Sequence, residues 1–114
     1  MQPEAFLSRR IMKAWRARGA WCFKVHGSEF QPSGIPDIHG TYLGFSVWCE
    51  TKMPGNDLSK IQRYRIGKIR EAGGLVVVAY SVAEAEALLD HIDEGHDLGC
   101  GCSYSEVGDI GLNQ

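Results

Sequence analysis

Apolar residues recur along the N-terminal quarter of the chain with two different periods. Residues 4–18 carry a stripe at helical spacing, and Gly19 follows where the helix would end. The stripe consists of Leu7, Ile11, Ala14 and Trp15. Residues 20–26 alternate with the period of a strand that has one core face. The two alternating sets are Trp21, Phe23 and Val25 against Cys22, Lys24 and His26.

The rest of the pattern completes one α/β domain. The further predicted elements are a hairpin of strands at 36–39 and 45–52, a helix at 58–72, a strand at 75–80 and a helix that begins after Ser81. Gly73 ends the middle helix, and Ser81 with Glu84 forms a capping box. The order α-β-β-β-α-β-α predicts a central mixed β-sheet flanked by helices.

We expect residues 1–93 to form this domain and residues 94–114 to form an acidic, Gly-rich C-terminal tail. The tail contains His96, Cys100 and Cys102. A structural zinc site usually takes four ligands in two pairs, and here the second pair is missing. The composition therefore favours a flexible or loosely docked tail over a zinc site.

Charge is divided unevenly between the two halves of the chain. The 12 Lys and Arg residues all lie within residues 1–70, beside five acids, whereas residues 71–114 hold nine acids and no Lys or Arg. A local positive field suits a polyanionic partner such as DNA, although two solvated faces of opposite sign would give the same count. No apolar run is long enough to span a bilayer and no signal-peptide pattern appears, so we expect no membrane association and a cytoplasmic location.

Two short segments with acidic residues, one at the start of the predicted hairpin and one at its end, are the strongest candidates for chemistry. Asp37 closes the segment Gly34-Ile35-Pro36-Asp37, and Glu50-Thr51-Lys52 follows a mostly apolar strand. Because alternate side chains of a strand share a face, Glu50 and Lys52 should lie together, with Thr51 opposite. The hairpin can bring Asp37 beside Glu50, so that two carboxylates and one ammonium converge.

Such a group suits a hard divalent cation and a water molecule next to a phosphate. A nearby lysine can orient the water or stabilise negative charge on the phosphate. The alternative is an exposed hairpin with a salt bridge between Glu50 and Lys52, because this spacing is common on exposed strands. The apolar run 45–49 favours the first interpretation, because an exposed edge strand is seldom apolar on both faces.

These segments, with Ser33 before Gly34 and with Gln62 on the following helix, resemble the VRR-NUC branch of the PD-(D/E)xK nucleases. The resemblance extends from about residue 4 to about residue 89 and includes the order of the elements. It implies a restriction-endonuclease-like core and Mg²⁺ or Mn²⁺ as cofactor. It also implies that Asp37, Glu50 and the Thr51 backbone carbonyl bind the metal.

The resemblance assigns further roles. Lys52 would position the attacking water, and Gln62 would bond to the lysine, the water or a phosphate, although it is also an ordinary solvated glutamine by its pattern. Glu4 is a candidate third carboxylate, because a glutamate at this point of the family leans toward the metal. Its spacing places it in the buried stripe, and the alternative is a first-turn acid that complements the helix dipole. His26 and His39 flank the site, where a structural hydrogen bond is favoured over a chemical role.

The implied activity is hydrolysis of phosphodiester bonds by a structure-specific DNA endonuclease. Small stand-alone family members, from phages or bacteria, resolve four-way (Holliday) junctions, which implies a bacterial or phage-infected cell and a homodimer with two sites. Alternatives are a flap, nick or restriction-like repair nuclease, and a non-catalytic DNA-binding module of the same fold. The predicted DNA contacts are Arg9, Lys13, Lys24, Lys60 and Arg63, and the apolar candidates for a dimer interface are Trp15, Trp21, Trp48 and Leu43.

Overall fold

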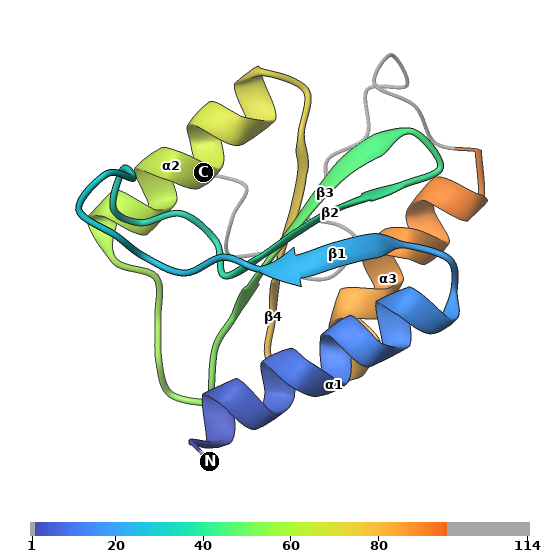
Figure 1. Ribbon diagram of the computed structural model, residues 1–114, viewed down its shortest axis with the longest axis horizontal. Helices are drawn as coiled ribbons and strands as arrows, with labels where there is room; N and C mark the ends of the chain where they lie inside the picture. The colour runs from blue at the N-terminus through green and yellow to red at the C-terminus, as the bar shows by residue number, and fades with distance from the viewer. Residues whose placement is uncertain (1, 96–114) are drawn as a thin grey trace.

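Residues 2–95 fold into seven elements in the predicted order α-β-β-β-α-β-α. The structure is a computed structural model that describes residues 2–95, so the candidate zinc ligands His96, Cys100 and Cys102 lie outside the described part (Figure 1). The elements are α1 (Pro3–Ala17), β1 (Trp21–Lys24), β2 (Ile38–Tyr42), β3 (Phe45–Thr51), α2 (Lys60–Glu71), β4 (Leu75–Ala79) and α3 (Val82–Asp93). Within residues 2–95, none of the helices combines the length and the apolar character needed to cross a membrane.

The four strands form one mixed sheet in the order β1-β2-β3-β4. The first three strands are antiparallel to one another, and β4 runs parallel to β3. Leu43 and Gly44 make the two-residue turn between β2 and β3, and both have the positive φ that favours a tight hairpin. This turn fixes the register, so that Ile38 lies opposite Cys49 and Asp37 enters the sheet beside Glu50 and Thr51.

Helices cover the two faces of the sheet unequally. The first face carries α1 and α3, and the main core between them includes Ile11, Trp15, Val47 and Leu88 (Figure 1). The Trp15 indole donates a hydrogen bond to the Ala85 carbonyl at 3.0 Å and is fully buried. Trp15 therefore belongs to the core, and its proposed place in a dimer interface is wrong, because α3 covers the apolar stripe of α1.

The second face is covered only in part. Helix α2 packs against β4 through a smaller cluster of Ile66, Val76 and Val78, which Trp48 and Ile69 extend. It leaves the β1 end of this face uncovered.

Strand β1 has one core face, as predicted, and that face carries the smaller side chain. Cys22 is buried beneath α1, whereas Trp21 is 68% and Phe23 40% exposed on the uncovered face. There the Trp21, Phe23, His39 and Trp48 rings follow one another across the sheet. The alternation was correct, but α1 lies on the side of the smaller residue, so the larger side chains face outward.

Candidate active site

The loop before β2 is held against α2, and this contact places Asp37. Gly34 has φ +84°, and a Cβ at this position would lie 2.8 Å from the Ile61 carbonyl oxygen. The Arg65 side chain donates a hydrogen bond to the Ser33 carbonyl at 2.9 Å. Glycine is needed here for both the left-handed backbone and the close approach, which explains the glycine of the Gly34-Ile35-Pro36-Asp37 segment.

The Asp37 carboxylate lies at the end of the sheet, where it is surrounded by donors. Its Oδ1 accepts a hydrogen bond from the Thr51 backbone N–H at 2.9 Å. Its Oδ2 accepts from Ser8 Oγ at 3.0 Å and from the Thr51 hydroxyl, and Lys24 Nζ lies 3.4 Å away. Asp37 thus connects α1, β1 and β3, and its charge is compensated by groups of the protein itself.

Glu50 lies on the other side of β3 and is far less well compensated. It is 6% exposed, accepts one hydrogen bond from Gln62 Nε2 at 3.2 Å, and has Lys52 Nζ at 3.9 Å. Burial, and next the charge of Asp37 and a hydrogen bond with it, raise the pKa of Glu50 to about 8, while Lys52 acts in the opposite direction. The site therefore holds two neighbouring carboxylates of which one lacks a sufficient positive partner.

Gln62 is oriented by the first turn of α2. Its Oε1 accepts a hydrogen bond from the Ser59 backbone N–H at 2.9 Å, while the Ser59 hydroxyl accepts from the Gln62 N–H at 3.2 Å. This capping box fixes the amide oxygen and turns the amide nitrogen toward Glu50. Gln62 therefore lies beside Glu50, at the position that the sequence predicted.

Lys52 follows directly after β3, with its backbone N–H bonded to the Ala79 carbonyl at 3.0 Å. Its side chain is only 14% exposed and is directed at Glu50, as the strand alternation predicted. Thr51 points to the opposite face, where its hydroxyl lies 3.0 Å from Ser8 Oγ. An exposed hairpin with a surface salt bridge is thereby excluded, since Glu50 and Thr51 are both buried.

Sequence reasoning missed two groups around Asp37. Ser8 is 1% exposed and bonds to Asp37, and Lys24, expected at DNA, has its Nζ 3.1 Å from Ser8 Oγ and 3.4 Å from Asp37. The signal for Ser8 is a polar residue within the apolar stripe of α1. For Lys24, only the strand register shows the contact. Lys24 lies opposite Ile38, and Ile38 directly follows Asp37.

The expectation that Glu4 lies in the buried stripe is wrong, because it is exposed. The helical spacing was correct, but the first turn of α1 extends beyond the sheet that would cover it. Its charge still contributes to the raised pKa of Glu50. As a third metal ligand, Glu4 stays a prediction.

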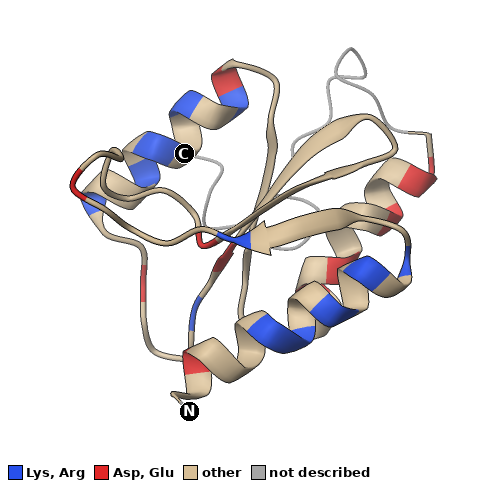
Figure 2. Ribbon diagram, in the orientation of Figure 1, with Lys and Arg blue, Asp and Glu red and all other residues tan. Residues whose placement is uncertain are grey.

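The remaining candidates lie around the site rather than in it. Arg9 and Lys13 are exposed on α1, and Lys60 and Arg63 are exposed on α2. Figure 2 marks several lysine and arginine positions along both helices. His39 stacks on Trp48 with ring centroids 3.7 Å apart, and burial lowers its pKa. That contact agrees with the structural role favoured for this histidine.

The donor set fits a divalent cation that retains water ligands. Among residues 2–95, no group of three or more His, Cys, Asp and Glu side chains is arranged to enclose a metal. Mg²⁺ needs only one or two carboxylates, with water and phosphate oxygens for the rest. Asp37 and the undercompensated Glu50 supply those two carboxylates.

Comparisons with known proteins agree on the fold. No protein-family model matches the sequence, and no curated protein matches it. Among solved structures, a VRR_NUC domain superimposes with a TM-score of 0.68 and 22% identity, over 80% of this chain and 98% of that one. Hjc, a Holliday junction resolvase from Archaeoglobus fulgidus, superimposes with a TM-score of 0.53 and 22% identity, over 66% of this chain and 65% of that one. The chain therefore has the restriction-endonuclease-like α/β fold of a VRR_NUC domain, as its sequence predicted.

Proposed function

We propose that this protein is a metal-dependent DNA endonuclease that hydrolyses phosphodiester bonds. The observation that carries the proposal is the convergence of Asp37, Glu50, Lys52 and Gln62 at one end of β3. A second observation supports it, because the fold that presents these groups is that of a VRR_NUC domain. A module that only bound DNA would gain nothing from two neighbouring acids, one of them buried, facing a polyanion.

Each residue of the site has a proposed task. Asp37, Glu50 and the Thr51 carbonyl would hold Mg²⁺ or Mn²⁺, which when bound polarises the phosphate and lowers the pKa of water. Lys52 donates a hydrogen bond to the attacking water or to the phosphate oxygen on which charge grows. Gln62 holds the Glu50 carboxylate in place. In-line attack on phosphorus would leave 5′-phosphate and 3′-hydroxyl ends.

We propose branched DNA, such as a four-way junction, as the preferred substrate. The fold is shared with a protein described as a Holliday junction resolvase. Paired cuts in a junction require two sites, so the active form would be a homodimer. Trp21 and Leu43, each 68% exposed, are the candidates for its interface, with the half-buried Trp48 beside them. A monomer in light scattering, both free and on a junction, would instead favour a flap or nick endonuclease.

Cleavage of end-labelled duplex, flap and four-way junction tests the activity directly. Product should appear with Mg²⁺ or Mn²⁺ and disappear with EDTA, and Lys52→Ala should remove it. Lys68→Ala is the matched control, because Lys68 is 54% exposed on α2 and pairs with Glu71 at 3.5 Å, away from Glu50. Cleavage that survives EDTA, or that Lys52→Ala leaves unchanged, would refute the proposed site.

A further inference from the structure

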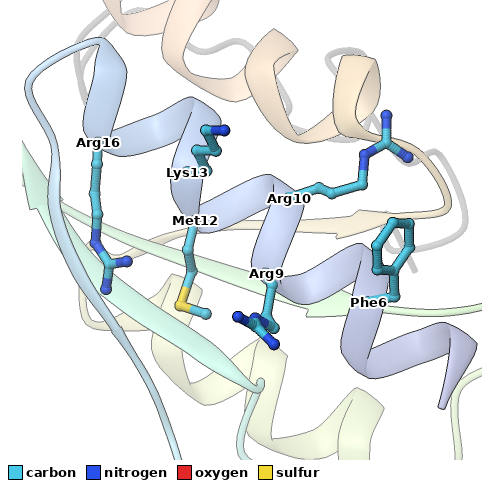
Figure 3. Close-up of a pocket in the computed structure, with 6 residues that line it drawn as sticks. All are labelled: Phe6, Arg9, Arg10, Met12, Lys13 and Arg16. Atoms are coloured by element: carbon cyan, nitrogen blue, oxygen red, sulfur yellow. The ribbon is translucent and has the colours of Figure 1, made fainter. Parts of the chain in front are cut away.

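A basic groove runs along the outer side of α1, beside the candidate active site. It encloses about 450 Å³. Its lining residues are Phe6, Arg9, Arg10, Met12, Lys13 and Arg16. Figure 3 shows Arg9, Met12 and Arg16 directed to the same side of the helix, with Arg10 beside the Phe6 ring. Among residues 2–95, the lining thus combines four cations and one aromatic ring with no acid.

The acidic residues of α3 do not neutralise this groove. Three of these acids pair with Arg18 instead, which follows α1. The ion pairs are with Glu86 at 3.4 Å, Asp90 at 2.7 Å and Asp93 at 2.7 Å. Figure 2 shows the resulting separation, with lysine and arginine along α1 and acids along α3. Four cations line the groove itself, so a polyanion is the ligand that it would attract.

Phe6 adds a feature that phosphate binding does not require. Its ring is 56% exposed, and the Arg10 guanidinium lies 5.9 Å from the ring centroid. The adjacent cation keeps the ring at the end of the groove rather than in the core. Proteins that bind single-stranded nucleic acid stack unpaired bases on exposed aromatic rings, while neighbouring cationic side chains contact the phosphate backbone.

The groove is close to the acidic pair. Ser8, two residues after Phe6, bonds directly to the Asp37 carboxylate at 3.0 Å. Two residues of α-helix correspond to a rise of about 3 Å along the axis. Around the helix the two side chains are about 200° apart, with Phe6 56% and Ser8 1% exposed, so a strand in the groove would have to pass around the N-terminal end of α1 to reach the candidate metal ligands.

We propose that this groove binds an unpaired stretch of DNA, with the backbone along Arg9, Lys13 and Arg16 and one base stacked on Phe6. The inference rests on the proposed function for its ligand and deepens it. Bases within a duplex are already stacked on their neighbours, so only an unpaired or frayed base can reach the Phe6 ring. The groove would accordingly select DNA that has an opened base near the cut, as a branch point does.

Binding in EDTA tests this proposal without cleavage. The probe is a single-stranded oligonucleotide that carries 2-aminopurine, whose fluorescence is quenched when the base stacks. Phe6→Leu should weaken binding about fivefold or more and remove the protein-dependent quenching. Tyr64→Leu is a matched control, because Tyr64 is 53% exposed on α2 and also has cations beside its ring, Arg65 at 5.2 Å and Lys68 at 5.6 Å.

Unchanged quenching in Phe6→Leu, or an equal loss in Tyr64→Leu, would overturn the assignment. Lys13→Gln should lower the salt dependence of binding by about 0.7 in the log–log slope, whereas Lys68→Gln should not. The two proposals fail separately. If stacking depends on Phe6 but no DNA is cleaved, the DNA-binding groove stands and the nuclease proposal is refuted. If DNA is cleaved but no such stacking occurs, the nuclease proposal stands and the groove proposal is refuted.

Discussion

The two carboxylates of the site differ sharply although they are neighbours at the end of one sheet. Asp37 receives hydrogen bonds from Ser8, from the Thr51 backbone and hydroxyl, and from Lys24. Glu50 is more deeply buried and receives one hydrogen bond, from Gln62. The fold has therefore satisfied the charge of Asp37, while the charge of Glu50 needs a cation. In the proposed site, Asp37 would organise the surrounding groups, and Glu50 would offer a metal a carboxylate with little compensation from the protein.

Lys24 pairs with Asp37 and Lys52 pairs with Glu50. Replacing these two lysines should give the largest difference in cleavage rate. Lys52→Ala should lower the rate about 100-fold or more with DNA binding nearly intact, because Lys52 is the ammonium beside Glu50. Lys24→Ala should lower it roughly tenfold or less, because Ser8 and Thr51 still hold Asp37. Single-turnover cleavage and anisotropy on the same DNA measure both effects. Equal losses of rate would remove the distinction.

The stability of the metal-free protein should fall as pH rises. The pKa of Glu50 is about 8 in the folded protein and 4.5 in the reference state, so the folded chain binds more protons between these values. The stability that protonated Glu50 contributes is complete below about pH 4.5 and is lost as pH rises through about 8, with a total of at most about 5 kcal/mol. Urea unfolding in EDTA across this range checks the trend, and Glu50→Gln should flatten it. An equal slope in the variant would contradict the assignment.

Neutralising each acid in turn should shift stability in opposite directions. At pH 8 without metal, Asp37→Asn should destabilise the fold by about 1–2 kcal/mol, because Lys24 and the Thr51 and Ser8 donors lose an ionised acceptor. Glu50→Gln should raise the melting temperature, since it removes a buried charge. Both variants should bind Mn²⁺ more weakly in calorimetry and lack cleavage. Unchanged Mn²⁺ affinity in both would refute the metal site.

The smallest expected effect concerns the orientation of Glu50. Gln62→Ala removes the hydrogen bond to Glu50 and half of the capping box, and should cost about 1 kcal/mol of stability and roughly tenfold in cleavage rate. Ser59→Ala removes the hydroxyl half of the box and leaves the Gln62 side chain. It should cost similar stability with little change in rate. Equal rates in the two variants would show that Gln62 acts only as a cap.

The sequence alone determined the order of the helices and strands, and it located the candidate site residues at the end of a strand. Two-residue alternation placed Glu50 and Lys52 on one face and Thr51 on the other, and the structure has them so. The capping residue Ser81 and the glycine after α2 marked helix ends correctly. These features are local, because periodicity and capping depend on residues within a few positions of one another.

Only the tertiary structure decided which face is covered and what each charge meets. Alternation in β1 defines two faces, but the position of α1 buries Cys22 and leaves Trp21 exposed. The stripe of α1 includes Glu4, yet the sheet ends before it. The raised pKa of Glu50 likewise arises from burial and from Asp37, 13 residues away in sequence. Burial and electrostatic fields depend on contacts between distant segments, which no local pattern contains.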